Sequence, residues 1–168
     1  MQPKRRELYR ERTGWAPWVH LLLWGAVGGS AAAILLGTTD AADQTAPGRF
    51  LAALALLGAG VLIQLLFGGL TVVVEPDAVR AGLGNGWIFR TRIPLDDVSS
   101  MEAVTYSPLK EFGGWGLRGG SRKRAWTARG DRALVLTLQD GRKVYLGSDD
   151  PAKLESRIRM AMASGRAG

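Results

Sequence analysis

The chain has 168 residues, of which 46% are hydrophobic, and its 22 basic and 15 acidic side chains give a net charge of +7. It contains no cysteine, which excludes disulfides, thiolate nucleophiles and cysteine-ligated metals. The hydrophobic residues concentrate in the first 70 positions, and the 98 residues that follow are enough for one small domain with its own core.

The first 14 residues are rich in positive charge. Their net charge is +3, from five basic residues against Glu7 and Glu11. The basic residues are Lys4, Arg5, Arg6, Arg10 and Arg12. Basic flanks of an apolar segment stay on the cytoplasmic side of a membrane. We therefore expect residues 1–14 to form a basic cytoplasmic tail.

Two apolar stretches follow, over 16–37 and 50–70, and neither contains Asp, Glu, Lys or Arg. A hydrocarbon core about 30 Å thick needs about 20 apolar residues in a helix. The short polar segment between them, 38–49, has a net charge of −1 and reads as an external loop. Residues 15–70 are thus predicted to be a transmembrane hairpin, which returns the chain to the cytoplasm.

Two other interpretations of the apolar stretches are weaker. A cleaved signal peptide would have the tail as its basic region and Ala31-Ala32-Ala33 as its cleavage site. Its apolar part would be unusually long, and a second apolar stretch follows it. Two buried helices of a soluble protein would each show a polar stripe, which is almost absent here.

Particular side chains in the hairpin suggest roles at the membrane surface or in helix packing. Trp15 and Trp18 lie at the entry of the first span, where indole rings favour the headgroup layer. His20, the only histidine, is interpreted as an interfacial side chain. Small residues and a glutamine that allow close helix contact recur at four-residue spacing. These packing candidates are Gly25 and Gly29 in the first span and Gly60, Gln64 and Gly68 in the second. Packing within the hairpin is the favoured interpretation, and a homo-oligomer through the remaining face is the alternative.

From residue 71 onward the pattern is typical of β-structure. Asn85-Gly86 and Asp140-Gly141 are hairpin-turn signals, because these residues tolerate positive φ. The predicted strands cover 71–75, 78–83, 87–93, 98–106, 132–139 and 142–146. The chain ends in an amphipathic helix of about 12–14 residues, with Asp150 as its N-cap and Pro151 in its first turn.

About seven antiparallel strands capped by one helix is the order of the pleckstrin-homology (PH) fold. The chain resembles bacterial PH-like membrane proteins with an N-terminal two-helix hairpin. The resemblance is carried by the segments Thr-Val-Val-Val at 71–74, Ile-Pro-Leu-Asp-Asp-Val at 93–98, Gly-Gly-Trp-Gly-Leu-Arg at 113–118 and Val-Leu-Thr-Leu-Gln-Asp-Gly-Arg at 135–142. It implies an α+β membrane protein: a transmembrane hairpin, then a cytoplasmic PH-like β-barrel over 71–168 with a C-terminal capping helix. It also implies an inner-membrane location, and no catalytic residue can be carried over from it. With two spans and a basic N-terminal segment, both termini are expected to be cytoplasmic.

One segment, 107–130, is the candidate binding region. It holds six glycines and a net charge of +5, interleaved with aromatic residues such as Trp115 and Trp126. Its cations are Lys110, Arg118, Arg122, Lys123, Arg124 and Arg129. Glycine-rich backbone can cradle anions, and each cation near an anionic leaflet gains about 1 kcal/mol. The segment is thus predicted to bind anionic lipid headgroups, with Trp115 as an interfacial aromatic. The alternative, held equally, is two glycine-broken core strands with a solvated basic rim.

Enzyme chemistry has little support. There is no Ser-His-Asp set and no phosphate-binding loop, and the paired carboxylates Asp96-Asp97 and Asp149-Asp150 fit a turn and a helix start. We expect no cofactor, no metal and no nucleic-acid partner. The leading hypothesis is a non-catalytic adaptor or scaffold that binds a protein partner or its own copies. A sensor of anionic lipid headgroups is the alternative, and an enzyme acting on a lipid ranks third.

Overall fold

The structure is a computed structural model that describes residues 7–37, 45–84 and 89–165. It divides into two units by the density of internal contacts. One is helical and spans Trp15–Leu65, and the other combines the described part of residues 1–14 with the chain from Leu66 onward.

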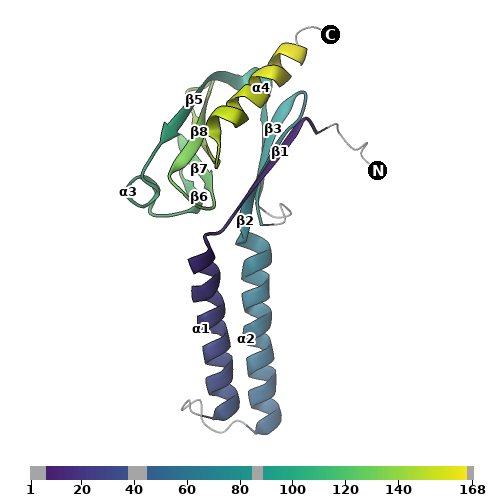
Figure 1. Ribbon diagram of the computed structural model, residues 1–168, viewed down its shortest axis with the longest axis vertical. Helices are drawn as coiled ribbons and strands as arrows, with labels where there is room; N and C mark the ends of the chain where they lie inside the picture. The colour runs from purple at the N-terminus through teal and green to yellow at the C-terminus, as the bar shows by residue number, and fades with distance from the viewer. Residues whose placement is uncertain (1–6, 38–44, 85–88, 166–168) are drawn as a thin grey trace. The chain divides into compact units, whose positions relative to one another are not determined.

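The helical unit contains α1, Pro17–Leu36, and all but the last two residues of α2, Ala46–Phe67 (Figure 1). Their 20 and 22 residues correspond to about 30 and 33 Å at 1.5 Å per residue. Both are long and apolar enough to cross a membrane, by length and composition. Proline starts α1, where its missing N–H costs nothing, and Gly37 ends it in the left-handed region at φ 68°.

The second helix begins earlier than predicted. Pro47-Gly48 was expected to belong to the external loop, but both residues lie in the first turn of α2. Proline is accepted there because the first N–H groups of a helix have no acceptor within it. The helix ends at Phe67, and the β-branched run from Thr71 continues as a strand. Most of the predicted loop, 38–44, lies outside the described residues.

The β unit holds an antiparallel sheet of four strands, in the order β1-β2-β3-β4. The strands are β1 Tyr9–Gly14, β2 Gly69–Val74, β3 Ala78–Leu83 and β4 Arg90–Pro94. The predicted strands 71–75, 78–83 and 87–93 correspond to β2, β3 and β4. The predicted Asn85-Gly86 turn lies outside the described residues.

Strand β1 comes from the segment interpreted as a tail. It pairs with β2 from Tyr9 opposite Val74 to Gly14 opposite Gly69. The segment alternates as a strand should: Tyr9, Glu11 and Thr13 are half-buried or buried, whereas the arginines between them are exposed. The strand was not predicted from the sequence because the many charged residues of this segment were interpreted as a solvated tail.

The second sheet has five strands in the order β5-β8-β9-β7-β6. They are β5 Val98–Thr105, β6 Gly116–Gly119, β7 Lys123–Thr127, β8 Arg132–Leu138 and β9 Lys143–Gly147. A single 3-10 turn, η1 Leu95–Asp97, separates β4 from β5, and a short helix, α3 Pro108–Phe112, precedes β6. Strands β7 and β9 are parallel, and the other pairs are antiparallel.

The described strands form two separate sheets, so the predicted closed barrel is not confirmed. They number nine rather than about seven, because β1 was taken for a tail and segment 107–130 contributes β6 and β7. The coarser prediction is confirmed: two long apolar helices precede an α+β unit that ends in a helix.

The C-terminal helix α4, Pro151–Gly165, completes the core (Figure 1). The backbone N–H of Lys153 donates to Oδ1 of Asp150 at 3.0 Å, which confirms the predicted cap. Leu154, Ile158 and Ala161 are fully buried, and the helix contacts β5, β8 and β2. Burying a leucine or isoleucine side chain stabilises the fold by about 1.5–3 kcal/mol.

A carboxylate joins β1 to the start of this helix. Glu11 accepts hydrogen bonds from Ser148 Oγ at 2.7 Å and from the Asp149 N–H at 2.9 Å. The hydroxyl of Ser148 in turn accepts a bond from the Asp150 N–H at 3.1 Å. This arrangement, the Glu11 latch, fixes the N-terminal strand against the rest of the β unit.

Candidate anion-binding site

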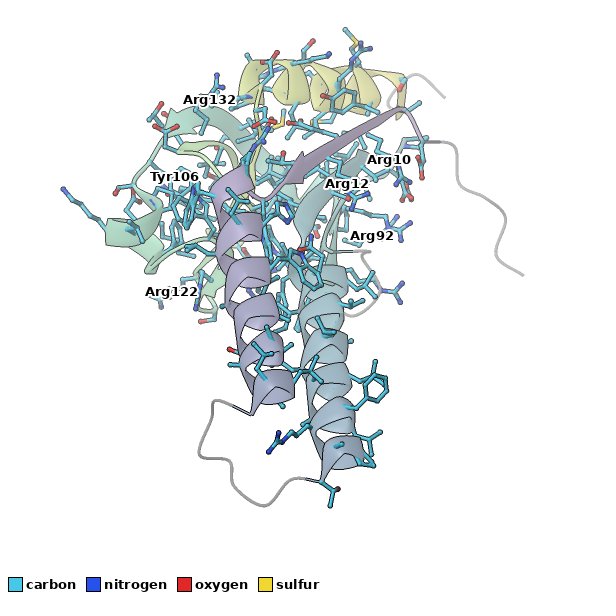
Figure 2. The ribbon with its side chains drawn as sticks, turned by 60° about the horizontal axis from the view of Figure 1, so that its bottom comes forward. Arg10, Arg12, Arg92, Tyr106, Arg122 and Arg132 are labelled. Atoms are coloured by element: carbon cyan, nitrogen blue, oxygen red, sulfur yellow. The ribbon has the colours of Figure 1, made fainter. Side chains whose placement is uncertain are left out.

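The outward face of the four-stranded sheet is lined with arginines. Strand register places Arg10, Val73, Arg80 and Arg92 in one row across the four strands. A second row holds Arg12, Thr71, Gly82 and Arg90. Side chains at successive cross-strand positions share one face of a sheet. Figure 2 shows Arg10, Arg12 and Arg92 gathered on one side of the β unit, away from Arg122.

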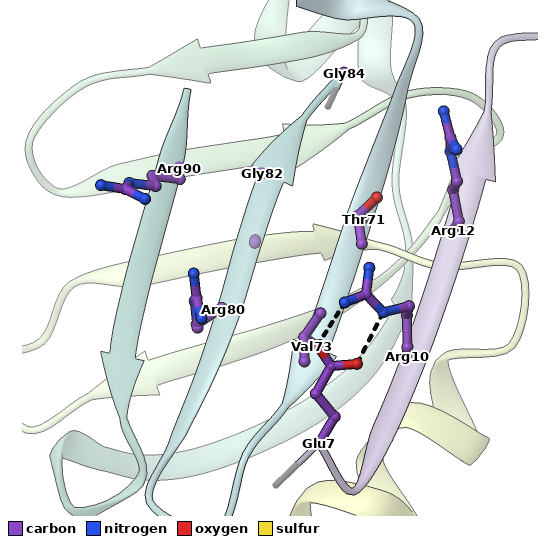
Figure 3. A pocket seen from close by; sticks show the side chains of 10 residues that line it. Glu7, Arg10, Arg12, Thr71, Val73, Arg80, Gly82, Gly84 and Arg90 are labelled. Atoms are coloured by element: carbon purple, nitrogen blue, oxygen red, sulfur yellow. Dashed lines mark hydrogen bonds and ion pairs between the residues drawn. The ribbon is translucent and has the colours of Figure 1, made fainter. Parts of the chain in front are cut away.

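Short side chains between the arginines leave a hollow. Thr71, Val73 and Gly82 occupy the two central strands, and a groove of about 470 Å³ lies over them (Figure 3). We call it the arginine groove. Its lining residues are Glu7, Arg10, Arg12, Thr71, Val73, Arg80, Ala81, Gly82, Gly84 and Arg90.

Two of the four lining arginines are already engaged by carboxylates. Glu7 binds Arg10 through two hydrogen bonds, of which the one from Nε is 3.0 Å long (Figure 3). These bonds raise the pKa of Arg10. Arg80 donates to Oε1 of Glu75 at 3.0 Å. Arg12 and Arg90 form no ion pair with any residue in the described part of the chain. With both carboxylates counted, the groove therefore carries a net charge of +2.

Glu75 is an uncommon partner because its side chain is only 2% exposed. Its Oε2 accepts no hydrogen bond from the described residues. A buried carboxylate with one satisfied oxygen holds its arginine firmly, since separating the pair would leave a buried charge uncompensated. The Arg80 side chain is thus held in place at the side of the groove. The side chains of Arg12 and Arg90 are exposed and can turn toward a ligand.

The predicted binding segment 107–130 has a different arrangement. Lys123 donates to Glu111 at 2.8 Å and lies over the rings of Phe112 and Tyr145. Arg129 forms a bidentate pair with Asp149. Two of the six predicted cations are therefore already paired within the fold.

The other four predicted cations are distributed over several elements. Lys110 is exposed on α3, Arg118 on β6 and Arg122 in the β6–β7 turn. Arg124 follows Lys123 on β7, and consecutive strand residues point to opposite faces. The structure does not gather the six into one cluster. Of the aromatics, Trp115 donates to the carbonyl of Gly130 at 2.8 Å and is half-buried, whereas Trp126 is 2% exposed. Trp126 thus matches the core-strand alternative.

In the helical unit, some packing candidates contact the neighbouring helix and others do not. Gly60 is buried against Val27 and Trp24, and a Cβ there would lie 3.2 Å from Val27. Gly25 and Gly29 are exposed and would have open space at a Cβ. Gly68, half-buried, lies outside this unit. Trp15 is half-buried 5.8 Å from the ring of His20, and Trp18 is 52% exposed.

A hydrogen bond between the two helices was missed from the sequence. His20 Nδ1 lies 3.2 Å from Gln64 Oε1. Both residues had been singled out separately, His20 as interfacial and Gln64 as a packing residue. The two residues are 44 positions apart, so no local pattern in the sequence indicates that they pair. They meet because the hairpin brings the start of one helix next to the end of the other.

Within the described residues, no three His, Asp or Glu side chains are grouped so that they could hold a metal ion. No family model matches this chain, and no curated protein matches it either. The PH-like resemblance therefore stays a prediction from the strand order and the quoted segments.

Proposed function

We propose that this chain is a membrane-anchored domain that binds anionic lipid headgroups through the arginine groove. The row of Arg12, Thr71, Gly82 and Arg90 carries the proposal. In it, two arginines without an ion-pair partner among the described residues flank a floor of small residues. Guanidinium groups suit phosphate because their planar fork donates two parallel hydrogen bonds.

Strand pairing supports a hairpin that enters and leaves the membrane on one side. Gly14 precedes α1 and Gly69 follows α2, and the two are paired in the same sheet. If both helices span the bilayer, their ends next to the sheet must then share a face of the membrane. The excess of basic residues in 1–14 and beyond residue 70 favours the cytoplasmic face.

Chain connectivity keeps the groove near the headgroups. Arg12 is five residues before Pro17, and Thr71 is four after Phe67. Fully extended, these tethers measure at most about 18 and 14 Å. The headgroup region adds about 5–8 Å on each side of the hydrocarbon core. The tethers are thus too short to carry the groove far from lipid. Because the helices already hold the groove near the headgroups, a weak affinity of the groove for a headgroup is enough for binding.

A lipid titration tests the proposal. Full-length protein in a neutral detergent is titrated with phosphatidylglycerol or with phosphatidylcholine, and its thermal unfolding is followed. A ligand that binds the folded state raises the unfolding midpoint. We expect phosphatidylglycerol to raise it more than phosphatidylcholine, and the difference to shrink as salt rises. The variant Arg12→Gln/Arg90→Gln should lose most of this difference.

The control variant is Arg118→Gln/Arg122→Gln, which removes the same two charges from the predicted segment 107–130. It should respond to phosphatidylglycerol as the unmodified chain does. The proposal fails if the groove variant keeps its full response. Loss of the response only in the control would instead support a lipid site in segment 107–130.

The adaptor role stays an alternative proposal. An equal response of all three proteins to the two lipids would remove the headgroup function and favour the adaptor. Crosslinking in membranes would then show whether the partner is a second copy, since Gly25 and Gly29 leave room on α1 for close contact.

A further inference from the structure

The cations that line the arginine groove fall into two groups. Arg10 and Arg12 lie on β1, whereas Arg80 and Arg90 lie on β3 and β4. Strand β2 separates the two groups, and its lining residues carry no charge. Figure 3 shows the two groups on opposite sides of the strand that holds Val73. The positive charge of the groove is thus divided between its two sides.

Each group has one carboxylate partner, so each has a net charge of +1. On the β1 side, Glu7 neutralises one of the two arginines. On the other side, the buried Glu75 neutralises one of two. The arginines that stay without an ion-pair partner in the described chain are Arg12 and Arg90, one in each group. We call the two groups, each with its carboxylate, the β1 pole and the β4 pole.

The distance between the poles favours one anion at each of them. Arg12 and Arg90 lie at opposite ends of one cross-strand row, with Thr71 and Gly82 between them. At about 4.8 Å between neighbouring strands, the backbones of the two arginines are about 14 Å apart. Both guanidinium groups would reach one central phosphate only if both side chains lay extended over the floor, which costs side-chain entropy.

The charge of the poles matches phosphodiesters. A phosphodiester carries one negative charge, as in the backbone of DNA. One phosphodiester at each pole would therefore balance the net charge of the groove. A single phosphomonoester carries a charge of about −1.5 to −2 at neutral pH, and at either pole it would leave the other pole uncompensated.

We propose that the groove binds a lipid with two phosphodiester groups joined by a short linker, one group at each pole. This inference rests on the proposed headgroup function and specifies its ligand. Arg12 and Arg90 each donate to one phosphate, and the linker lies over Thr71 and Gly82. Once the first phosphodiester is bound, the linker holds the second near the other pole at a high effective concentration.

Cardiolipin is the probe, because a single glycerol joins its two phosphodiesters. Phosphatidylglycerol, with one phosphodiester, is the matched comparison. Full-length protein in a neutral detergent is titrated with each lipid, and its thermal unfolding is followed as a function of total lipid phosphate. The half-maximal response should need at least about fivefold less phosphate with cardiolipin than with phosphatidylglycerol. We call this ratio the cardiolipin preference.

Single variants test whether both poles are needed. In Arg12→Gln or Arg90→Gln, one pole remains to hold one phosphate of either lipid, so the cardiolipin preference should fall to about twofold or less. Arg122→Gln is the matched control, since it removes one exposed arginine from the β6–β7 turn. It should keep the full preference.

The outcomes separate this inference from the function on which it rests. Equal half-maximal phosphate for the two lipids, with both responses above that to phosphatidylcholine, would overturn the assignment of two phosphates and leave the headgroup function standing. A cardiolipin preference that persists in both single groove variants would overturn it as well. If neither anionic lipid exceeded phosphatidylcholine, the headgroup function would be rejected together with this inference.

Discussion

At the scale of single residues, the arginine groove contains an anion of its own. Glu7 lines it and holds Arg10 with two hydrogen bonds. Glu7 lies just before β1, so its carboxylate is in the position that a headgroup phosphate near Arg10 would take. A phosphate bound there would compete with Glu7 for the guanidinium of Arg10.

The competition predicts that Glu7→Gln tightens headgroup binding. Removing a negative charge from the groove frees Arg10 and raises the net charge from +2 to +3. The phosphatidylglycerol concentration at half-maximal response should fall severalfold, in the same thermal titration. Glu155→Gln is the matched control, since it frees Arg159 on α4 and should change nothing. An unchanged half-maximal concentration in Glu7→Gln would place Arg10 outside the binding site.

The pair of Glu111 and Lys123 predicts a pH dependence of stability. Hydrogen bonds from Lys123 and from the Ser107 N–H hold the pKa of Glu111 below its ordinary 4.5. The bond to Glu111 raises the pKa of Lys123 above 10.5. The stabilisation is therefore present above about pH 4.5 and is lost as pH falls through the lowered pKa of Glu111. It is also lost at high pH, as Lys123 deprotonates.

Glu111→Gln should accordingly lower the unfolding midpoint slightly at pH 7 and by a smaller amount at pH 3. The effect is small because both side chains are more than a third exposed, and exposed pairs contribute at most about 1 kcal/mol. A destabilisation of equal size at pH 3 and pH 7 would show that the charge of Glu111 is not what matters.

At the scale of elements, β1 is the part of the fold on which the groove depends. It supplies Arg10 and Arg12, and it is an edge strand paired only with β2. The Glu11 latch connects it to the segment before α4. Removing the latch should release the strand without removing any arginine.

Glu11→Ala should therefore loosen β1 and weaken headgroup binding together. Hydrogen bonds to a charged group contribute about 1.5–3 kcal/mol, so amide hydrogen exchange in β1 should accelerate by at least tenfold. Exchange in β8, in the interior of the other sheet, should change less. Glu102→Ala is a control on exposed β5, where the same loss of charge should leave β1 exchange unaffected. Equal exchange in β1 with and without Glu11 would contradict a role for the latch.

At the scale of the whole molecule, the proposed arrangement is a transmembrane hairpin. Its connecting loop lies outside the cell, and the β unit lies in the cytoplasm. The absence of cysteine makes this directly measurable, because any introduced thiol is unique. Thr45 precedes α2 and Ser156 is exposed on α4. A membrane-impermeant maleimide should label Thr45→Cys in intact cells and Ser156→Cys only after permeabilisation. Labelling of Ser156→Cys in intact cells would reverse the orientation and remove the cytoplasmic leaflet as the lipid source.

Local patterns determined much of the architecture. Continuous apolar runs predicted α1 and α2, since a charge-free run of this length has no polar face to present to water. Alternation predicted β2 to β5, β8 and β9, and the Asp150-Pro151 pair predicted the start of α4. These features depend on neighbours a few residues away, so they can be read from the chain alone.

Only the tertiary structure decided which charges act together. In segment 107–130 the sequence places six cations within 20 positions, but strand alternation and local ion pairs separate them. The arginine groove instead combines Arg10 and Arg12 with Arg80 and Arg90, which lie about 70 to 80 positions further on. Cross-strand neighbours are about 4.8 Å apart whatever their separation in the chain, and charges interact through space, so register rather than sequence proximity creates the site.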